Sequence, residues 1–377
     1  RSNFMKLLAV FGTRPEAVKM CPLVIELRRH KELECKVCLT GQHREMLKQV
    51  MDCFGIMEDY NLDIMQKNQT LTGITARILE KLEPVLKEER PDMVLVHGDT
   101  STSFASALAA FYQKIPVGHV EAGLRTEVRY SPFPEEINRR LTGCLASWHF
   151  APTAWNRQNL WRENIREHVY VTGNTVIDAF KTTVKPDYLF QNEDIRKIDF
   201  AHGPVILVTA HRRENLGEPL ENICRSLKRL SAEIPEAKIV YPVHLNPSVR
   251  DTVYHYLDKQ ENIILTAPLD VLDMHNLMAK CYMVMTDSGG LQEEAPALGK
   301  PVLVMRTETE RPEGIEAGTV QLVGIDEECI YNKAVQLLTD KESYDAMAKS
   351  VNPYGDGHAS ERIASILENE WQAGKEG

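Results

Sequence analysis

The sequence predicts an α/β protein made of two doubly wound halves. Three observations predict this class. Short runs rich in β-forming residues alternate with helical patterns, a polar and irregular stretch interrupts the alternation near the middle of the chain, and the alternation then restarts. Such an order is typical of parallel sheets covered by helices. The chain has 377 residues, which is too long for one compact core and comfortable for two domains.

The first half begins with an apolar run that ends at Gly12. Its expected strands are residues 6–11, 35–39, 93–96, 115–120, 148–150 and 169–171. The clearest helix starts at Leu71, and Glu80 and Lys81 lie on its polar side. Its apolar stripe consists of Leu71, Ile74, Ile78, Leu82 and Val85. Pro84 should kink or shorten this helix, because proline lacks a backbone N–H and clashes with the preceding turn.

The second half follows the polar stretch at residues 181–203. Its expected strands are residues 205–209, 238–243, 262–265, 283–286, 302–305 and 320–323. We place the boundary near residues 173–179, so that residues 5–175 form the first domain and residues 176–358 the second. A final helix is expected over residues 359–373, after a glycine-rich segment.

Composition narrows the possible partners and the compartment. The net charge of −10 disfavours nucleic acid and anionic membranes, so a phosphate-bearing ligand needs a local cluster of positive groups. No apolar run reaches the length of a membrane span, and no signal peptide precedes the first strand. The eight cysteines are scattered and form no disulfide framework. We therefore expect a cytoplasmic enzyme.

Cys35 and Cys38 have the C-x-x-C spacing, but they fall inside the strand expected over residues 34–39. Side chains three residues apart on a strand point to opposite faces, so the two sulfurs cannot share a metal ion there. We interpret both as buried thiols.

Open parallel sheets bind ligands at the carboxyl ends of their strands, so the residues after each strand carry the most information. Arg14 follows the first strand and Gly12, and Pro15 suits the first position of a helix. Amide donors and the macrodipole at such a helix start favour an anion. Arg14 is therefore either a phosphate contact or a surface arginine with a capping role.

Asp99, Glu121 and Glu135 could converge on one face of the first half. Clustered carboxylates raise one another's proton affinity and suit acid/base chemistry. Asp99 could instead only cap a helix, and an acid in the first helical turn, such as Glu135, is favourable on structural grounds alone. Metal binding is the competing use, ranked lower because no two of these carboxylates share a short motif.

Basic residues follow the first strand of the second half. His211, Arg212 and Arg213 make a good anion site, for which a solvated basic loop is the alternative. His244 follows the next strand.

After the strand at residues 283–286, the segment Ser288-Gly289-Gly290 offers a hydroxyl and bare amides at a helix start, fit to cradle a diphosphate. Glu294 is one turn further on and could accept both hydroxyls of a ribose. The alternative interpretation is that Glu294 is a solvent-facing glutamate without a ligand.

Taken as an ordered set, these motifs resemble the non-hydrolysing UDP-N-acetylglucosamine 2-epimerases of bacteria and archaea. The matching segments are residues 11–17, 40–46, 97–100, 119–125, 134–138, 209–215, 241–247, 286–296, 299–305 and 309–313. Each motif is weak alone, but together they cover nearly the whole chain and are specific.

The resemblance implies two Rossmann-like domains in the B-type glycosyltransferase fold, an active site in the interdomain cleft, and a final helix that returns to the first domain. It implies interconversion of UDP-N-acetylglucosamine and UDP-N-acetylmannosamine by anti elimination of UDP and syn re-addition through 2-acetamidoglucal. The family needs neither NAD nor a metal. UDP-N-acetylglucosamine and UDP are the expected ligands, and a homodimer is the expected assembly.

The resemblance also assigns roles to single residues. Asp99, Glu121 and Glu135 match the acid/base carboxylates, and His211 matches the residue that assists departure of UDP. The residues that match UDP contacts are Arg14, Ser288, Gly289 and Gly290 for the diphosphate, Glu294 for the ribose and Met274 for the uracil.

Bacterial members bind a second, activating UDP-N-acetylglucosamine. The matching residues are Gln42, His43, Arg212 and His244, whereas Asn68 stands where some relatives carry arginine. Residues 42–46 also argue against the hydrolysing branch of the family, which departs from this segment. That branch and a glycosyltransferase of the same fold are the alternative activities, and a nucleotide-sugar sensor without turnover is the alternative from another class.

Overall fold

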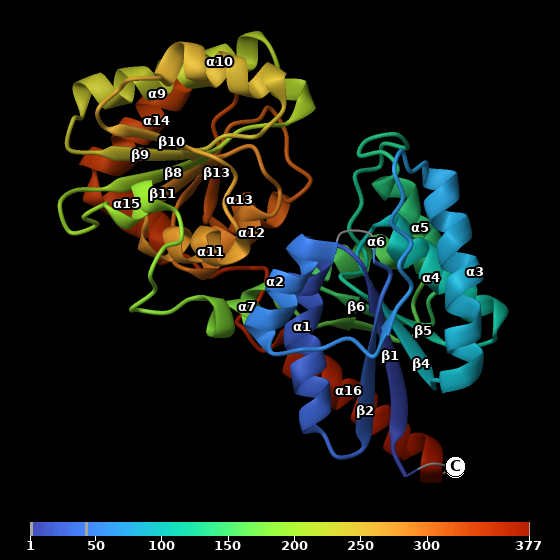
Figure 1. Ribbon diagram of the computed structural model, residues 1–377. Helices are drawn as coiled ribbons and strands as arrows, with labels where there is room; N and C mark the ends of the chain where they lie inside the picture. The colour runs from blue at the N-terminus through green and yellow to red at the C-terminus, as the bar shows by residue number, and fades with distance from the viewer. Residues whose placement is uncertain (1–2, 42–43, 377) are drawn as a thin grey trace. The chain divides into compact units, whose positions relative to one another are not determined.

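The computed structural model describes residues 3–41 and 44–376 and divides the chain into two compact units. Unit 1 runs to Thr182 and includes the chain from Tyr354 onward, while unit 2 is the continuous segment Thr183–Pro353. Each unit is a parallel sheet with helices packed against it (Figure 1). The expected α/β class with two doubly wound halves is confirmed.

Unit 1 contains a seven-stranded sheet in the order β3-β2-β1-β4-β5-β6-β7. Its strands are β1 (Met5–Phe11), β2 (Leu33–Leu39), β3 (Tyr60–Asn61), β4 (Met93–His97), β5 (Val117–Val120), β6 (Trp148–Ala151) and β7 (Val169–Val171). Its helices are α1 (Arg14–Arg29), α2 (Arg44–Phe54), α3 (Leu71–Glu89), α4 (Ser101–Tyr112), α5 (Glu135–Leu145), α6 (Ala154–Arg162), α7 (Thr175–Thr183) and α16 (Ala359–Glu376). Every strand expected here is present, whereas β3 was missed because two residues show no periodicity.

Unit 2 contains a six-stranded sheet in the order β10-β9-β8-β11-β12-β13. Its strands are β8 (Val205–Thr209), β9 (Lys238–Pro242), β10 (Ile263–Thr266), β11 (Met283–Thr286), β12 (Val302–Val304) and β13 (Val320–Leu322). Its helices are α8 (Glu193–Arg196), α9 (Glu218–Glu233), α10 (Pro247–Leu257), α11 (Val271–Lys280), α12 (Leu291–Ala297), α13 (Pro312–Ala317), α14 (Glu327–Thr339) and α15 (Lys341–Ala348). A short 3₁₀ turn spans Arg213–Asn215. All expected strands of this half are confirmed.

α3 starts at Leu71, as expected. It buries Ile74, Ile78, Leu82 and Val85 on one face, although Leu71 itself is exposed. The expectation that Pro84 shortens the helix is wrong, because the helix continues to Glu89. Proline removes one backbone donor, but the buried Leu86 that follows keeps the last turn packed on the core.

In both units the strand order reverses beside the first strand. β1 pairs with β2 on one side and β4 on the other, and β8 pairs in the same way with β9 and β11. In doubly wound sheets, ligands bind outside the carboxyl ends of the strands at such a switch point. The turns after β1 and β4, and those after β8 and β11, are therefore the expected ligand-binding turns.

The end of the chain belongs to unit 1. The boundary expected after residue 175 coincides with the start of α7, and unit 1 extends past it to Thr182. α7 carries Asp178, whose carboxylate accepts the backbone N–H groups of Ala359 at 3.2 Å and Ser360 at 2.6 Å. These donors start α16, which packs against α1. A side chain of unit 1 therefore caps the helix that ends the sequence.

The thiols of Cys35 and Cys38 are buried on β2, as expected, and burial raises the pKa of each to about 12.

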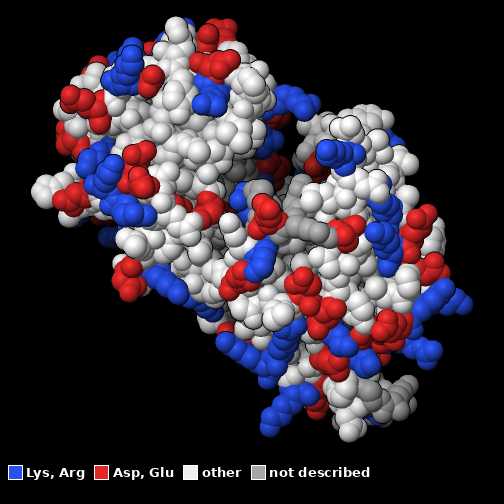
Figure 2. Space-filling model, in the orientation of Figure 1, with Lys and Arg blue, Asp and Glu red and all other residues white. Residues whose placement is uncertain are grey.

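On the face in Figure 2, the described Lys and Arg side chains are interspersed with Asp and Glu rather than gathered in one basic area. No helix within the described ranges is long and apolar enough to cross a membrane.

The capping role of Asp178 gives a stability prediction. We expect Asp178→Ala to lower the free energy of unfolding by about 1 kcal/mol, and the apparent melting temperature with it, because the first amides of α16 lose their acceptor. Amide hydrogen exchange over residues 359–370 should accelerate, while exchange in β8 stays unchanged. The exposed Asp187 is the matched control, since Asp187→Ala removes the same group from the surface. Unchanged exchange in α16 would contradict the assignment.

Candidate active site

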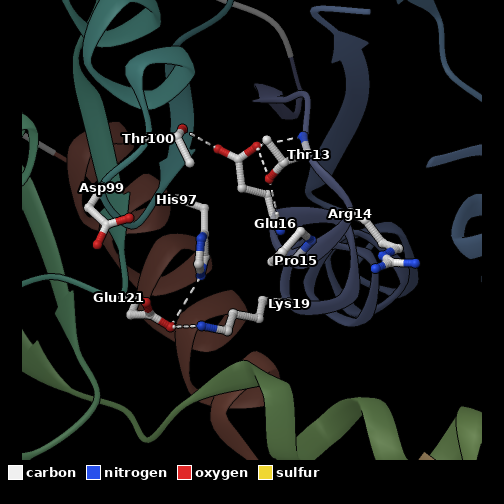
Figure 3. Close-up of a pocket in the computed structure, with 9 residues that line it drawn as sticks. All are labelled: Thr13, Arg14, Pro15, Glu16, Lys19, His97, Asp99, Thr100 and Glu121. Carbon is white, nitrogen blue, oxygen red and sulfur yellow. Dashed lines mark hydrogen bonds and ion pairs between the residues drawn. The ribbon is translucent and has the colours of Figure 1, made fainter. Parts of the chain in front are cut away.

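A cavity of about 460 Å³ lies at the switch point of unit 1, where β1 and β4 end (Figure 3). Its lining residues are Thr13, Arg14, Pro15, Glu16, Lys19, His97, Asp99, Thr100 and Glu121. They come from the start of α1, the β4–α4 turn and the end of β5. Sequence reasoning named Arg14, Asp99 and Glu121, and the structure brings these three to one cavity.

Arg14 is the first residue of α1, and Thr13 is its N-cap. Pro15 is therefore the second helical residue rather than the first, a correction of one position. The Thr13 hydroxyl accepts the N–H of Glu16 at 3.4 Å, and Glu16 returns a bond to the backbone of Thr13 at 2.8 Å. This capping box fixes the turn that presents the half-buried Arg14 to the cavity.

Glu121 is held in place by three contacts to one carboxylate oxygen. It adopts a left-handed backbone with φ 62°, and its Oε2 lies 2.6 Å from Nζ of Lys19, 3.1 Å from Nδ2 of Asn174 and 3.4 Å from Nε2 of His97. Burial raises the pKa of this carboxyl, but the Lys19 ammonium and the His97 ring outweigh burial and hold its pKa well below the usual range. We expected clustered carboxylates to raise one another's proton affinity, and for Glu121 that expectation is wrong, because its nearest charged neighbour is a cation.

Asp99 also faces a cation, since Nη2 of Arg139 donates to its Oδ2 at 2.7 Å. Glu135 is the first residue of α5, as expected, and is half-buried, but it is not among the residues that line the cavity. Its neighbour Glu136 is the buried acid, and it accepts the N–H of Thr126 at 2.9 Å. The cavity thus contains two of the three expected acids.

His119 fixes the turn that carries Asp99. It is completely buried on β5, and its Nε2 lies 2.7 Å from the carbonyl oxygen of Gly98. Burial lowers the pKa of His119 to about 3, so the neutral ring donates to that carbonyl. Gly98 has φ 66°, a left-handed conformation that glycine adopts without strain.

In unit 2, one buried carboxylate shapes the basic turn after β8. Asp287, at the end of β11, accepts the backbone N–H groups of His211 and Arg212, each at 3.0 Å, and Nδ2 of Asn215 at 3.0 Å. Sequence reasoning missed this role of Asp287. Asp287 and His211 are 76 residues apart in the sequence, so no local sequence pattern predicts the hydrogen bond between them.

The rings of His211 and His244 stack with centroids 5.2 Å apart and planes 6° apart. Desolvation lowers the pKa of His211, as do the neighbouring His244 and Arg212, although Asp287 opposes them. Arg212 itself donates to Glu214 at 2.7 Å, so part of the positive charge of this turn is already paired. His244 accepts the N–H of Asn246 on Nδ1, which leaves the proton on Nε2.

The Ser288-Gly289-Gly290 segment immediately precedes α12. The N–H of Ser288 is not bare, since it donates to the hydroxyl of Thr286 at 2.9 Å. Gly289 lies against Arg311, and a Cβ added there would stand 2.3 Å from Nη1 of that side chain. Arg311 in turn donates to Glu310 at 2.5 Å. A larger residue at position 289 would therefore have to displace the ends of the Arg311 and Glu310 side chains beside the expected diphosphate cradle.

The remaining expected contacts lie in unit 2 or outside the described residues. Glu294 is half-buried on α12, and Met274 is half-buried on α11, where it packs against the core. Gln42 and His43 lie outside the described residues. Within residues 3–41 and 44–376, no three His, Cys, Asp or Glu side chains are grouped so that they could hold a metal ion.

Comparison with known proteins identifies the family. The family model described as UDP-N-acetylglucosamine 2-epimerase matches residues 25–368. The chain belongs to the UDP-N-acetylglucosamine 2-epimerase family. The enzyme of that name from Salmonella typhimurium is 54% identical over 371 residues, which cover 97% of this chain and 99% of the relative.

Two solved structures extend this comparison. The crystal structure of UDP-GlcNAc 2-epimerase from Neisseria meningitidis bound to UDP-GlcNAc matches with a TM-score of 0.88 at 50% identity, covering 97% of this chain and 100% of that one. The Methanocaldococcus jannaschii enzyme in complex with UDP-GlcNAc and UDP matches with a TM-score of 0.80 at 35% identity, with the same coverage. The resemblance and the enzyme class expected from the sequence are confirmed: the chain is an isomerase that acts as a UDP-N-acetylglucosamine 2-epimerase.

Lys19, which sequence reasoning did not single out, controls the charge of the cavity. We expect Lys19→Met to lower the free energy of unfolding by up to about 3 kcal/mol at pH 7, because an uncompensated carboxylate stays buried. Since Lys19 depresses the folded-state pKa of Glu121, the stabilisation is present above the ordinary value of 4.5 and is lost as pH falls through the lowered value. The deficit of the variant should therefore shrink in acid.

Urea unfolding measured from pH 7 down to about pH 3, below the ordinary value of 4.5, tests this effect. Lys87→Met is the matched control, because Lys87 forms an ion pair of the same 2.6 Å length with Glu83 in which both side chains are exposed. The control should cost less than about 1 kcal/mol. A Lys19→Met deficit that does not depend on pH would show that the ammonium does not set the charge state of Glu121.

Proposed function

We propose that the chain interconverts UDP-GlcNAc and UDP-N-acetylmannosamine by anti elimination of UDP and syn re-addition through 2-acetamidoglucal. The observation that carries this proposal is the cavity of unit 1, where Asp99 and Glu121 are both paired with cations. Neither a metal nor NAD takes part in this chemistry, and UDP is not released to water. A homodimer is the assembly that the family resemblance implies.

The C2 proton of the sugar is not acidic, so a base must act while the leaving diphosphate is stabilised. Glu121 is ionised at neutral pH, as a base must be, but its ion pair with Lys19 makes it a weaker base than a free glutamate. Asp99 and Glu135 are the other proposed acid/base groups. An epimerase must remove a proton from one face of C2 and return one to the other, which requires more than one such group.

The leaving UDP must be held until it adds back to the glucal. We propose that Arg14 and the Ser288-Gly289-Gly290 segment hold the diphosphate, Glu294 the ribose and Met274 the uracil. His211 would assist departure, and its lowered pKa keeps the ring neutral near pH 7, so it would donate a hydrogen bond to the diphosphate rather than act as a cation. The guanidinium of Arg311 lies against Gly289 but is paired with Glu293 and Glu310, so it would bind a diphosphate only by exchanging one of these acids.

We further propose that a second UDP-GlcNAc activates the enzyme through Gln42, His43, Arg212 and His244. The stacked rings of His211 and His244 support this idea, because the proposed leaving-group residue and an activator contact are in direct contact. The relative crystallised with both UDP-GlcNAc and UDP also supports it.

The decisive measurement is proton NMR of the enzyme with UDP-GlcNAc in deuterated water. We expect UDP-N-acetylmannosamine to accumulate without an acceptor and deuterium to enter at C2, because the proton is exchanged during elimination. Free N-acetylmannosamine as the main product would replace this function with the hydrolysing one. Consumption only in the presence of an acceptor would indicate a glycosyltransferase.

Asp99→Asn is the control for this assay. It should reduce turnover by at least about a hundredfold, because a general acid or base contributes about 10²–10⁴-fold to the rate, and UDP should still bind. Full activity in this variant would remove Asp99 from the mechanism.

Initial rates test the second site. We expect a sigmoidal dependence on UDP-GlcNAc, and we expect the reverse reaction to need a trace of the same sugar, because the activator must bind before turnover. Arg212→Gln should weaken the activation, whereas Arg250→Gln, a matched change on exposed α10, should not. Hyperbolic kinetics in both directions would count against activation.

A further inference from the structure

Glu16 is a buried carboxylate that touches two helix starts. It is 2% exposed, although it occupies the first turn of α1, where an acid that only offsets the helix dipole can remain in water. Its Oε2 accepts the N–H of Gly12 at 2.9 Å and that of Thr13 at 2.8 Å, and it also accepts the Thr13 hydroxyl at 2.9 Å. One oxygen thus satisfies the whole turn between β1 and α1.

The second oxygen reaches the other turn of the cavity. Oε1 of Glu16 accepts the hydroxyl of Thr100 at 2.5 Å and lies 3.2 Å from that of Ser103. Thr100 is the N-cap of α4, and its hydroxyl accepts the N–H of Ser103 at 3.1 Å. Figure 3 shows Glu16 between Thr13 and Thr100, with a bond to each. The N-caps of α1 and α4 are therefore joined through one side chain.

These two N-caps are adjacent in sequence to proposed active-site residues. Arg14 follows Thr13, and Asp99 precedes Thr100. A displacement of either N-cap moves the neighbouring side chain in the cavity, and a misplacement of about 1 Å can cost about a hundredfold in rate. The arrangement exceeds what capping α1 requires, because a capping box uses one carboxylate oxygen and leaves the other free.

We infer that Glu16 is a positioning residue for the epimerisation: its carboxylate fixes Asp99 through Thr100 and Arg14 through Thr13. This inference rests on the roles proposed above for Asp99 and Arg14. Glu16 does not exchange a proton with the substrate, since both of its oxygens are occupied by protein donors. It acts on the rate only through the two turns.

Glu16→Gln is the sharpest substitution. The side chain keeps its size, but its amide has one oxygen for two groups of donors. If the amide oxygen faces Gly12 and Thr13, it preserves the hydrogen bonds of the turn before α1, and the NH₂ group then faces Thr100. The Thr100 hydroxyl must then accept instead of donate. Because that hydroxyl already accepts the N–H of Ser103 at 3.1 Å, the link to Asp99 is weakened before the link to Arg14. We expect kcat to fall at least about tenfold while KM changes less than about threefold.

Thr100 provides a second route to the same test. Thr100→Val removes the hydroxyl and should lower kcat in the same way, whereas Thr100→Ser keeps it and should restore the rate. Thr153→Val is the matched control, because Thr153 is the buried N-cap of α6, accepts the N–H of Asn156 at 3.1 Å and does not line the cavity. This control should lose a similar amount of thermal stability without the loss of kcat.

A double-mutant cycle with Asp99→Asn decides the mechanism. If Glu16 acts through Asp99, adding Glu16→Gln to Asp99→Asn should change the residual rate less than about threefold, because the groups act as a unit. Full kcat in Glu16→Gln, or the same loss with and without Asp99, would overturn the inference. Full activity in Asp99→Asn alone would instead remove Asp99 from the proposed mechanism, and with it the premise of this inference. If Glu16→Gln fails to fold, the Thr100 pair gives the same decision.

Discussion

The site depends on one constraint, the need to satisfy backbone N–H groups where the first strand of each sheet ends. Both units meet it with a buried carboxylate. Glu16 accepts the amides of the turn after β1, and Asp287 accepts those of the turn after β8. A polar group buried without a partner costs about 1–3 kcal/mol, so each carboxylate stabilises its turn strongly. The shape of the turns that hold Arg14 and His211 follows from this solution.

The charges of the candidate site are arranged around the same turns. The acids of unit 1 face cations, with Lys19 at Glu121 and Arg139 at Asp99. In unit 2 a buried aspartate, Asp287, instead accepts backbone N–H groups of the turn that carries His211 and Arg212. The cations near both sets of turns are thus largely paired with carboxylates, so the positive charge available to a diphosphate is partly compensated.

Most of the fold could be predicted from the sequence, because strands buried on both faces appear as apolar runs that need no tertiary information. β3 was missed since it has two residues, and the effect of Pro84 was misjudged because packing of the last turn outweighs one lost backbone bond. In the site, Arg14, Asp99 and Glu121 were found from their positions after strands. Lys19 and Asp287 were missed, because their partners lie 102 and 76 residues away and only the folded chain brings them together.

The return of α16 to unit 1 has a consequence for synthesis on the ribosome. Unit 2 is one continuous segment, so it can fold as soon as it has left the exit tunnel. Unit 1 begins first but lacks the helix that packs against α1 until α16 has been made, after the whole of unit 2. The domain that holds the carboxylates therefore completes its core last. A ribosome that stops before α16 leaves an apolar face of α1 uncovered, whatever the state of unit 2.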